Sequence, residues 1–200
     1  MVWSAVYYPP SPLRSLAVVV DEASLAPTPS GDGRVFLYSG VQLLLMQKEI
    51  RTLIELEEEA KRFVNTLAPS LRGATLVTLS GELGAGKTAF TKAVAHALGV
   101  EEIVTSPTFV LEKIYLLSNQ SFKRLIHIDA YRLEKGSDLA SLGFDELMKD
   151  SGNLILLEWP ENVAGALPEP DIKISIVANP DGPPSIKSDL VLGSRTITYG

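Results

Sequence analysis

The sequence contains no cysteine, which excludes disulfide bonds, thiolate metal sites and cysteine nucleophiles. Long hydrophobic runs are absent as well, since no stretch approaches the ~18 consecutive apolar residues that a membrane-spanning helix needs. The apolar stretch at residues 16–20 is too short for the hydrophobic part of a secretion signal, and prolines precede it. We therefore expect a cytoplasmic protein without membrane contact and without a disulfide-bonded partner.

Positive charge is also in short supply. Lysine and arginine together number 18, against 24 aspartates and glutamates, so the formal net charge at pH 7 is −6. Proteins that grip nucleic acid by neutralising phosphates show the opposite balance, so we expect any contact with nucleic acid to be indirect. With 200 residues and 46% hydrophobic content, the chain suffices for one domain with a sizeable core.

Residues 1–45 differ in composition from the rest of the chain, because they are rich in proline and show no sustained helical or strand periodicity. We expect them to form a disordered N-terminal extension, followed by one folded domain over residues 46–200. One interpretation is that Met46 is the biological start and that an upstream start codon supplied the extension. The other is a real extension that docks on a partner through aromatic side chains, Trp3 among them.

The hydrophobic pattern after residue 46 predicts alternating helices and strands. Apolar residues at helical spacing predict helices before Pro69 and before Gly99, and near-continuous apolar runs predict strands that are buried on both faces. The expected strands are residues 74–80, 109–117, 124–129 and 153–159, a third helix runs from Ser137 as N-cap past Gly143 to Leu147, and residues 172–177 and 188–198 form a C-terminal edge hairpin. This order predicts an α/β domain with three layers around a mostly parallel central sheet.

The most informative motif fits the pattern G-x-x-x-x-G-K-[ST] at every fixed position. Its residues are Gly81, Glu82, Leu83, Gly84, Ala85, Gly86, Lys87 and Thr88, and we call them the phosphate loop. A predicted strand precedes the loop and a predicted helix follows it, which is the context that a phosphate-binding loop requires. Glycines let backbone N–H groups approach phosphate oxygens, Lys87 supplies charge, and the Thr88 hydroxyl is suited to ligate Mg²⁺. The motif predicts a protein that binds a nucleoside triphosphate.

Two predicted strands end in an acid, Asp129 and Glu158. In parallel sheets the carboxyl ends of strands lie at one edge, so both acids are candidates to hold the magnesium or to place the attacking water. Residues 105–108 precede another predicted strand, and from the sequence alone Thr108 is more simply part of a proline-containing turn than a switch residue. Trp159 is either a core residue or a site-lining aromatic, and we include it among the candidate nucleotide contacts.

Neither of the two histidines is predicted to be catalytic. His127 lies inside an apolar strand and is expected to be packed and hydrogen-bonded, and His96 lies off the apolar stripe of its helix, so we expect it at the surface.

Four motifs in this order and spacing resemble the TsaE family, formerly YjeE, of small bacterial ATPases required to form threonylcarbamoyladenosine at position 37 of tRNA. Besides the phosphate loop, they are Ser106-Pro107-Thr108-Phe109, His127-Ile128-Asp129-Ala130-Tyr131-Arg132-Leu133 and Leu157-Glu158-Trp159-Pro160-Glu161. The resemblance covers about residues 50–178 and implies a P-loop NTPase fold.

The resemblance also implies roles for individual residues. The phosphate loop and Lys87 would hold the phosphates of ATP, and Thr88 with Glu158 would serve Mg²⁺. Asp129 would orient or activate the attacking water, and Thr108 would be a switch-like hydroxyl near the γ-phosphate. The family further implies an ATPase that is weak alone and works with a heterodimer of TsaD and TsaB, meeting tRNA only through that complex.

This sequence departs from the family at several positions. Ala89 stands where a second hydroxyl is usual, so one neutral hydrogen bond worth ~1 kcal/mol to the nucleotide is missing. Ala60 falls where the first helix of the family often carries a threonine, so we assign that helix no binding residue. Arg132 matches the family pattern without an assigned contact.

The residues leave three other functions open. A small-molecule kinase would need an acceptor pocket and an arginine-bearing lid, and the sequence has no arginine-rich insert. A GTPase would need an Asn-Lys-x-Asp segment to read guanine, which is absent. A nucleotide-dependent binding module would use the same loop, with hydrolysis only incidental.

Overall fold

The computed structural model describes residues 46–179 and 191–200. The N-terminal extension expected over residues 1–45, and the expected hairpin tip near residues 180–184, lie outside this description. The hypothesis that Met46 is the biological start therefore stays a prediction. None of the helices in the two described ranges has the length and apolar character needed to cross a membrane.

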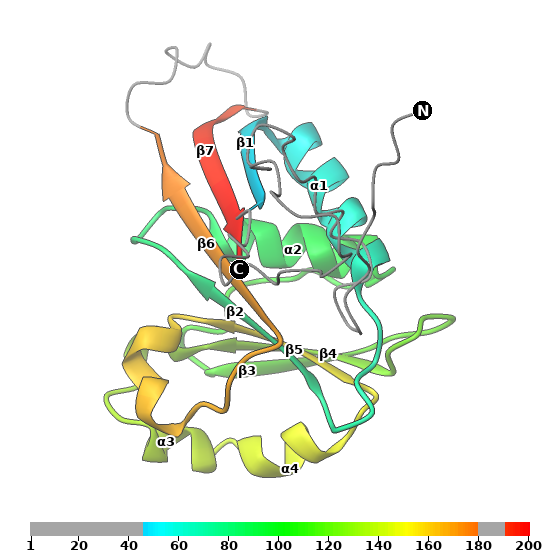
Figure 1. The fold of residues 1–200 in the computed structure, drawn as a ribbon, viewed down its shortest axis with the longest axis vertical. Coiled ribbons are helices and arrows are strands. Elements are labelled where there is room, and N and C mark those ends of the chain that lie inside the picture. The colour runs from blue at the N-terminus through cyan, green and yellow to red at the C-terminus, as the bar shows by residue number, and fades with distance from the viewer. Residues whose placement is uncertain (1–45, 180–190) are drawn as a thin grey trace, which may run out of the picture. The chain divides into compact units, whose positions relative to one another are not determined.

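The described chain contains both helices and strands (Figure 1). The elements are β1 (Met46–Thr52), α1 (Leu53–Thr66), β2 (Thr75–Ser80), α2 (Lys87–Ala97), β3 (Glu112–Leu116), β4 (Arg124–Asp129), the 3₁₀ helix η2 (Ala130–Arg132), α3 (Ser137–Ala140), α4 (Phe144–Lys149), β5 (Asn153–Glu158), the 3₁₀ helix η3 (Pro160–Ala166), β6 (Ile172–Ala178) and β7 (Val191–Tyr199). The strands of these two ranges form one seven-stranded sheet in the order β1-β7-β6-β2-β5-β4-β3.

The centre of the sheet is parallel. β2 pairs parallel with β5 and with β6, and β5 pairs parallel with β4. The outer pairs, β3 with β4, β6 with β7 and β7 with β1, are antiparallel. The predicted α/β class with a mostly parallel central sheet is confirmed.

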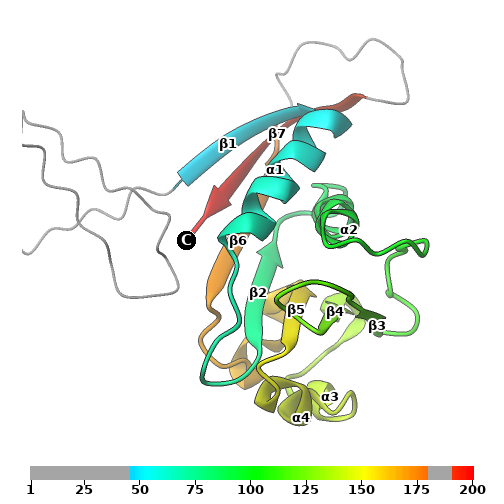
Figure 2. The same cartoon turned by 90° about the vertical axis from the view of Figure 1, so that its right-hand side faces the viewer.

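Successive side chains along the central strands pack on opposite faces of the sheet, as strand geometry requires. On one face, Val77, Leu125 and Leu156 pack in a core with α1 and α2. On the other, Leu76 and Ile155 pack in a second core with α3, α4 and η3. Figure 2 shows the helices on the two sides of the central strands, which makes three layers. Burial on both faces explains why these strands read as continuous apolar runs.

β1 was not predicted, and it changes the position of the C-terminal hairpin. The hairpin of β6 and β7 exists, but β1 pairs antiparallel with β7 and takes the edge of the sheet. The expectation of an edge hairpin is therefore wrong in position. The residues of β1 are mostly polar and exposed, with Ile50 fully buried, so their sequence carries little apolar alternation.

Two other elements differ from the sequence prediction. The expected helix from Ser137 to Leu147 is two short helices, because Gly143 adopts a left-handed conformation between α3 and α4. Gly136, and not Ser137, is the N-cap of α3. The strand expected from Phe109 begins only at Glu112, since the Pro107 carbonyl accepts from the Val110 N–H and closes a turn.

Leu156 tests the packing of the central sheet. Its side chain on β5 is fully buried, so Leu156→Ala should lower the free energy of unfolding by about 2–5 kcal/mol through lost burial and a residual cavity. Leu71→Ala is the matched control, because Leu71 is fully exposed, and it should change this energy by less than about 0.5 kcal/mol. Urea unfolding of both variants measures the difference, and similar values for the two would contradict the core assignment.

Candidate functional site

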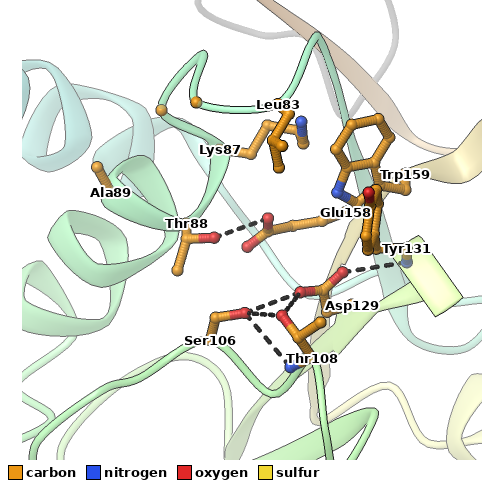
Figure 3. Close-up of a pocket in the computed structure, with 12 residues that line it drawn as sticks. Leu83, Lys87, Thr88, Ala89, Ser106, Thr108, Asp129, Tyr131, Glu158 and Trp159 are labelled. Atoms are coloured by element: carbon orange, nitrogen blue, oxygen red, sulfur yellow. Dashed lines mark hydrogen bonds between the residues drawn. The ribbon is translucent and has the colours of Figure 1, made fainter.

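A pocket of about 330 Å³ lies at the carboxyl ends of the parallel strands β2, β4 and β5. The loop after β2, the acids that end β4 and β5, and the segment before β3 all contribute to it (Figure 3). Its lining residues are Leu83, Gly84, Gly86, Lys87, Thr88, Ala89, Ser106, Thr108, Asp129, Tyr131, Glu158 and Trp159.

The glycines of the phosphate loop are required by its backbone. Gly81, Gly84 and Gly86 have φ angles of 142°, 79° and 114°, which side-chain-bearing residues rarely adopt. A Cβ on Gly81 would also lie 2.3 Å from the carbonyl oxygen of Ile176 on β6. Gly86 is the N-cap of α2, so the loop delivers the chain directly into the N-terminus of that helix. This end of α2 carries partial positive charge and faces the pocket.

The ammonium group of Lys87 lies against the first residues of the phosphate loop. Its Nζ donates to the carbonyls of Gly81 at 2.6 Å and Glu82 at 2.9 Å, and lies 3.5 Å from the centroid of the Trp159 ring. Burial lowers the pKa of Lys87, although the nearby carboxylates, Glu158 first among them, act in the opposite direction. A buried ammonium beside a pocket is suited to an anionic ligand, which would favour its charged form.

Glu158 ends β5. Its carboxylate forms hydrogen bonds with a residue of α2 and with a residue of β4. Its Oε2 accepts from the Thr88 hydroxyl at 2.9 Å, and its Oε1 lies 2.7 Å from Nε2 of His127. Both Glu158 and His127 are buried. Nδ1 of His127 is buried without a hydrogen-bond partner among the described residues, so the tautomer with hydrogen on Nε2 fits the site, and His127 donates to Glu158.

Asp129 ends β4 and collects three hydrogen bonds. Its Oδ2 accepts from the hydroxyls of Ser106 at 2.8 Å and Thr108 at 2.6 Å, and its Oδ1 accepts from the Tyr131 N–H at 3.1 Å. The two hydroxyls also lie 2.5 Å apart. Figure 3 shows this cluster beside the Thr88–Glu158 pair. Asp129 is opposite Glu158 in the β4–β5 register, so the sheet itself sets the spacing of the two acids.

Aromatic rings form one wall of the pocket. Trp159 has a φ of 62°, which turns the chain sharply after β5, and its N–H donates to the Leu79 carbonyl. Its ring lies 4.9 Å from the Tyr131 ring, centroid to centroid. Trp159 lines the pocket, where its ring covers the Lys87 ammonium, and it also packs against the second core.

Most of the residues singled out from the sequence meet in this pocket. Leu83, Gly84, Gly86, Lys87, Thr88, Thr108, Asp129, Glu158 and Trp159 all line it. Gly81, Glu82 and Ala85 belong to the loop but do not line the pocket. Ala89 also lines the pocket, whereas Ala60 is buried in the core. His96 is exposed, as predicted, and Arg132 stacks 4.3 Å from the centroid of the exposed Phe109 ring.

Sequence reasoning missed four contributors to the site. Ser106 binds Asp129, His127 binds Glu158, Tyr131 lines the pocket, and Arg195 on β7 binds the Ala85 carbonyl at 2.8 Å. The first three belong to motifs named in the sequence analysis, and strand alternation places His127 on the same face of β4 as Asp129. Nothing near Arg195 in the sequence points to the phosphate loop.

The donor set suits magnesium. Mg²⁺ prefers oxygen ligands and is usually held by one or two carboxylates together with substrate phosphates and waters. The Thr88 hydroxyl and the Glu158 carboxylate supply such oxygens side by side, and Asp129 is next to them. Among the described residues there is no cluster of three or more His, Asp or Glu side chains that would form an all-protein metal cage.

The fold and the loop geometry define an α/β protein of the P-loop class. Residues 54–183 match the family model described as threonylcarbamoyl adenosine biosynthesis protein TsaE, which covers well over half of the chain. The chain therefore belongs to the TsaE family, whose members act in tRNA threonylcarbamoyladenosine biosynthesis.

Curated relatives and a solved structure agree. The chain is 40% identical over 121 residues to the tRNA threonylcarbamoyladenosine biosynthesis protein TsaE of Rickettsia felis, covering 60% of this chain and 68% of that protein. It is 40% identical over 119 residues to the protein of the same name in Bacillus subtilis, covering 60% and 72% of the two chains. The crystal structure of Bacillus subtilis YdiB matches with a TM-score of 0.54 at 30% identity, covering 78% of this chain and 86% of that one.

The buried pair of His127 and Glu158 predicts a difference between the two histidines. His127→Ala removes the donor to a buried carboxylate and leaves a cavity, so the free energy of unfolding should fall by about 2–3 kcal/mol. His96→Ala, at an exposed position, should change it by less than about 0.5 kcal/mol. Thermal and urea unfolding measure both variants, and equal stability of the two would show that the pair is not important for the fold.

Proposed function

We propose that this chain binds ATP in the pocket and hydrolyses it with Mg²⁺, as the ATPase of the tRNA threonylcarbamoyladenosine machinery. It acts in the cytoplasm with the TsaD–TsaB heterodimer and meets tRNA only through that complex. The observation that carries the proposal is the meeting of Lys87, Thr88, Asp129 and Glu158 at the N-terminus of α2. Membership of the TsaE family supports the biological setting.

Triphosphate binding is supported by the charge and backbone of the loop. The first turn of α2 and the glycine backbone offer N–H donors to phosphate oxygens, and Lys87 offers a cation from within the loop. We propose that Lys87 exchanges its carbonyl partners for phosphate oxygens when the nucleotide binds. Trp159 and Tyr131 then shield this region from water along one wall.

The two acids have different surroundings, which supports different roles. Thr88 and Glu158 would hold the magnesium. The bound ion would neutralise part of the negative charge of the phosphates. Asp129 is held by two hydroxyls and one backbone N–H, so its carboxylate is an aligned acceptor that can orient the attacking water. The Thr108 hydroxyl donates to the same carboxylate, so it links the segment before β3 to Asp129.

The composition of the pocket supports slow hydrolysis by the chain alone. Within the described part of the chain, Lys87 is the only cationic residue among the lining residues. Phosphoryl transfer is commonly accelerated by a second cation, often an arginine that a partner supplies. A pocket with one cation fits an ATPase whose rate rises when a partner completes the site. No arginine is among the lining residues of the described ranges, whereas we expect a small-molecule kinase to carry one on its lid.

Asp129 and Lys87 separate binding from hydrolysis. Asp129→Asn should still bind Mg-ATP but hydrolyse it about a hundredfold more slowly, because the amide orients water poorly and cannot accept its proton. Lys87→Ala should lose nucleotide binding. Calorimetric binding and phosphate release measure the two properties. Asp145→Asn on the exposed surface of α4 is the matched control and should behave as wild type, whereas equal turnover by wild type and Asp129→Asn would refute the catalytic role.

The biological proposal is tested by ATP hydrolysis in four mixtures: this chain alone, with TsaD–TsaB, with tRNA, and with both. We expect slow turnover alone and an increase of about tenfold or more once TsaD–TsaB is present, since the partner completes the charge at the site. Lys87→Ala in the same complete mixture controls for contaminating ATPases. Absence of stimulation would contradict the partnership, and transfer of phosphate to a small metabolite would support a kinase instead.

A further inference from the structure

Arg195 reaches the phosphate loop from a distant strand. It lies on β7, which β6 separates from β2 in the sheet. Its Nε donates to the Ala85 carbonyl at 2.8 Å, and its Nη2 lies 3.4 Å from the Gly84 carbonyl. Its Nη1 donates to the Gly193 carbonyl on its own strand at 2.8 Å. The polar partners of this guanidinium within the described chain are thus backbone carbonyls, and two of them belong to the phosphate loop.

The strand around Arg195 holds the side chain in this direction. Gly193 has a φ of 74°, and a Cβ there would lie 3.3 Å from Nη1 of Arg195. The next residue, Ser194, is fixed on both sides: its hydroxyl donates to Glu49 of β1 at 2.6 Å, and its carbonyl accepts from the Asn179 N–H at 2.9 Å. The base of the arginine side chain therefore starts from anchored backbone.

The contact with Ala85 has a geometric consequence for the pocket. In a trans peptide the C=O of one residue and the N–H of the next point in opposite directions. Holding the Ala85 carbonyl on the outside of the loop therefore directs the Gly86 N–H to the other side. Gly86 lines the pocket, and a Cβ on it would lie 3.3 Å from Nε of Arg195, so the guanidinium packs directly behind it.

Lys87 and Arg195 hold different parts of the loop. Lys87 binds the carbonyls of Gly81 and Glu82 from the pocket side, and Arg195 binds those of Gly84 and Ala85 from behind. Only the lysine lines the pocket, so only the lysine is available to leave the loop for a phosphate. We expect the contacts of Arg195 to persist in that exchange, because Arg195 is not among the residues that line the pocket.

We propose that Arg195 is a positioning residue for phosphate binding. It holds the outer carbonyls of the phosphate loop so that the Gly86 N–H faces the phosphate that the nucleotide presents there. The inference rests on the proposed nucleotide binding and adds to it a requirement for a residue of the C-terminal strand.

The test compares Arg195→Gln and Arg195→Lys with Arg72→Gln, an exposed arginine in the loop before β2. Titration calorimetry measures the affinity for Mg-ADP and Mg-ATP, and amide hydrogen exchange of the nucleotide-free protein measures the order of the loop. Arg195→Gln should weaken both nucleotides about tenfold, as expected for loss of a charge-assisted hydrogen bond, and should speed exchange of the loop amides. Arg195→Lys keeps one charged donor and should lose less, and Arg72→Gln should lose nothing.

Three results would overturn the inference. Unchanged affinity and exchange in Arg195→Gln would show that the guanidinium does not hold the loop. Loss of ATP affinity with ADP affinity kept would show that Arg195 meets the terminal phosphate directly and is not a positioning residue. Equal losses in Arg195→Lys and Arg195→Gln would show that a charged donor at this position is not what holds the loop. Failure of wild type and Arg72→Gln to bind either nucleotide would instead contradict the proposed function, and the exchange measurement still decides whether Arg195 orders the loop.

Discussion

The parallel pairing of β2, β5 and β4 aligns the carboxyl ends of three strands, and each polar group of the site depends on this alignment. Leu79 near the end of β2 pairs with Glu158, and Glu158 pairs with Asp129, so the loop after β2 starts beside both acids. A slip of one residue would turn each side chain to the opposite face of the sheet. In the observed register the apolar side chains of β4 and β5 pack in the two cores while Asp129 and Glu158 keep their hydrogen-bond partners, and a slip would break those contacts.

Burial at the site is costly and is offset by hydrogen bonds. Lys87, Asp129 and Glu158 retain only 4%, 3% and 1% of their exposure, and isolated charges with so little solvent contact would destabilise the fold. Each has fixed partners instead: two carbonyls and an indole ring for the lysine, hydroxyls and a backbone N–H for Asp129, and a hydroxyl and His127 for Glu158. These partners also fix the positions from which the groups would act on a nucleotide.

The C-terminal hairpin is part of the site as well as of the sheet. The Ile176 carbonyl of β6 packs against Gly81 and leaves no room for a side chain at that position. Arg195 of β7 packs behind Gly86. β7 lies beyond residues 54–183, which match the TsaE family model. The phosphate loop is therefore supported by two strands that follow it at the far end of the chain.

The P-loop class, the bounds of β4 and the identity of most pocket residues follow from the sequence alone, because they depend on short patterns of apolar, glycine and acidic residues. The sequence did not determine β1, whose polar strand exists only because β7 pairs with it, nor the split of one expected helix at Gly143. Only the tertiary structure joined Ser106 to Asp129, His127 to Glu158 and Arg195 to Ala85. Such contacts link residues as far as 110 positions apart, and their geometry comes from sheet order and register, which no local pattern encodes.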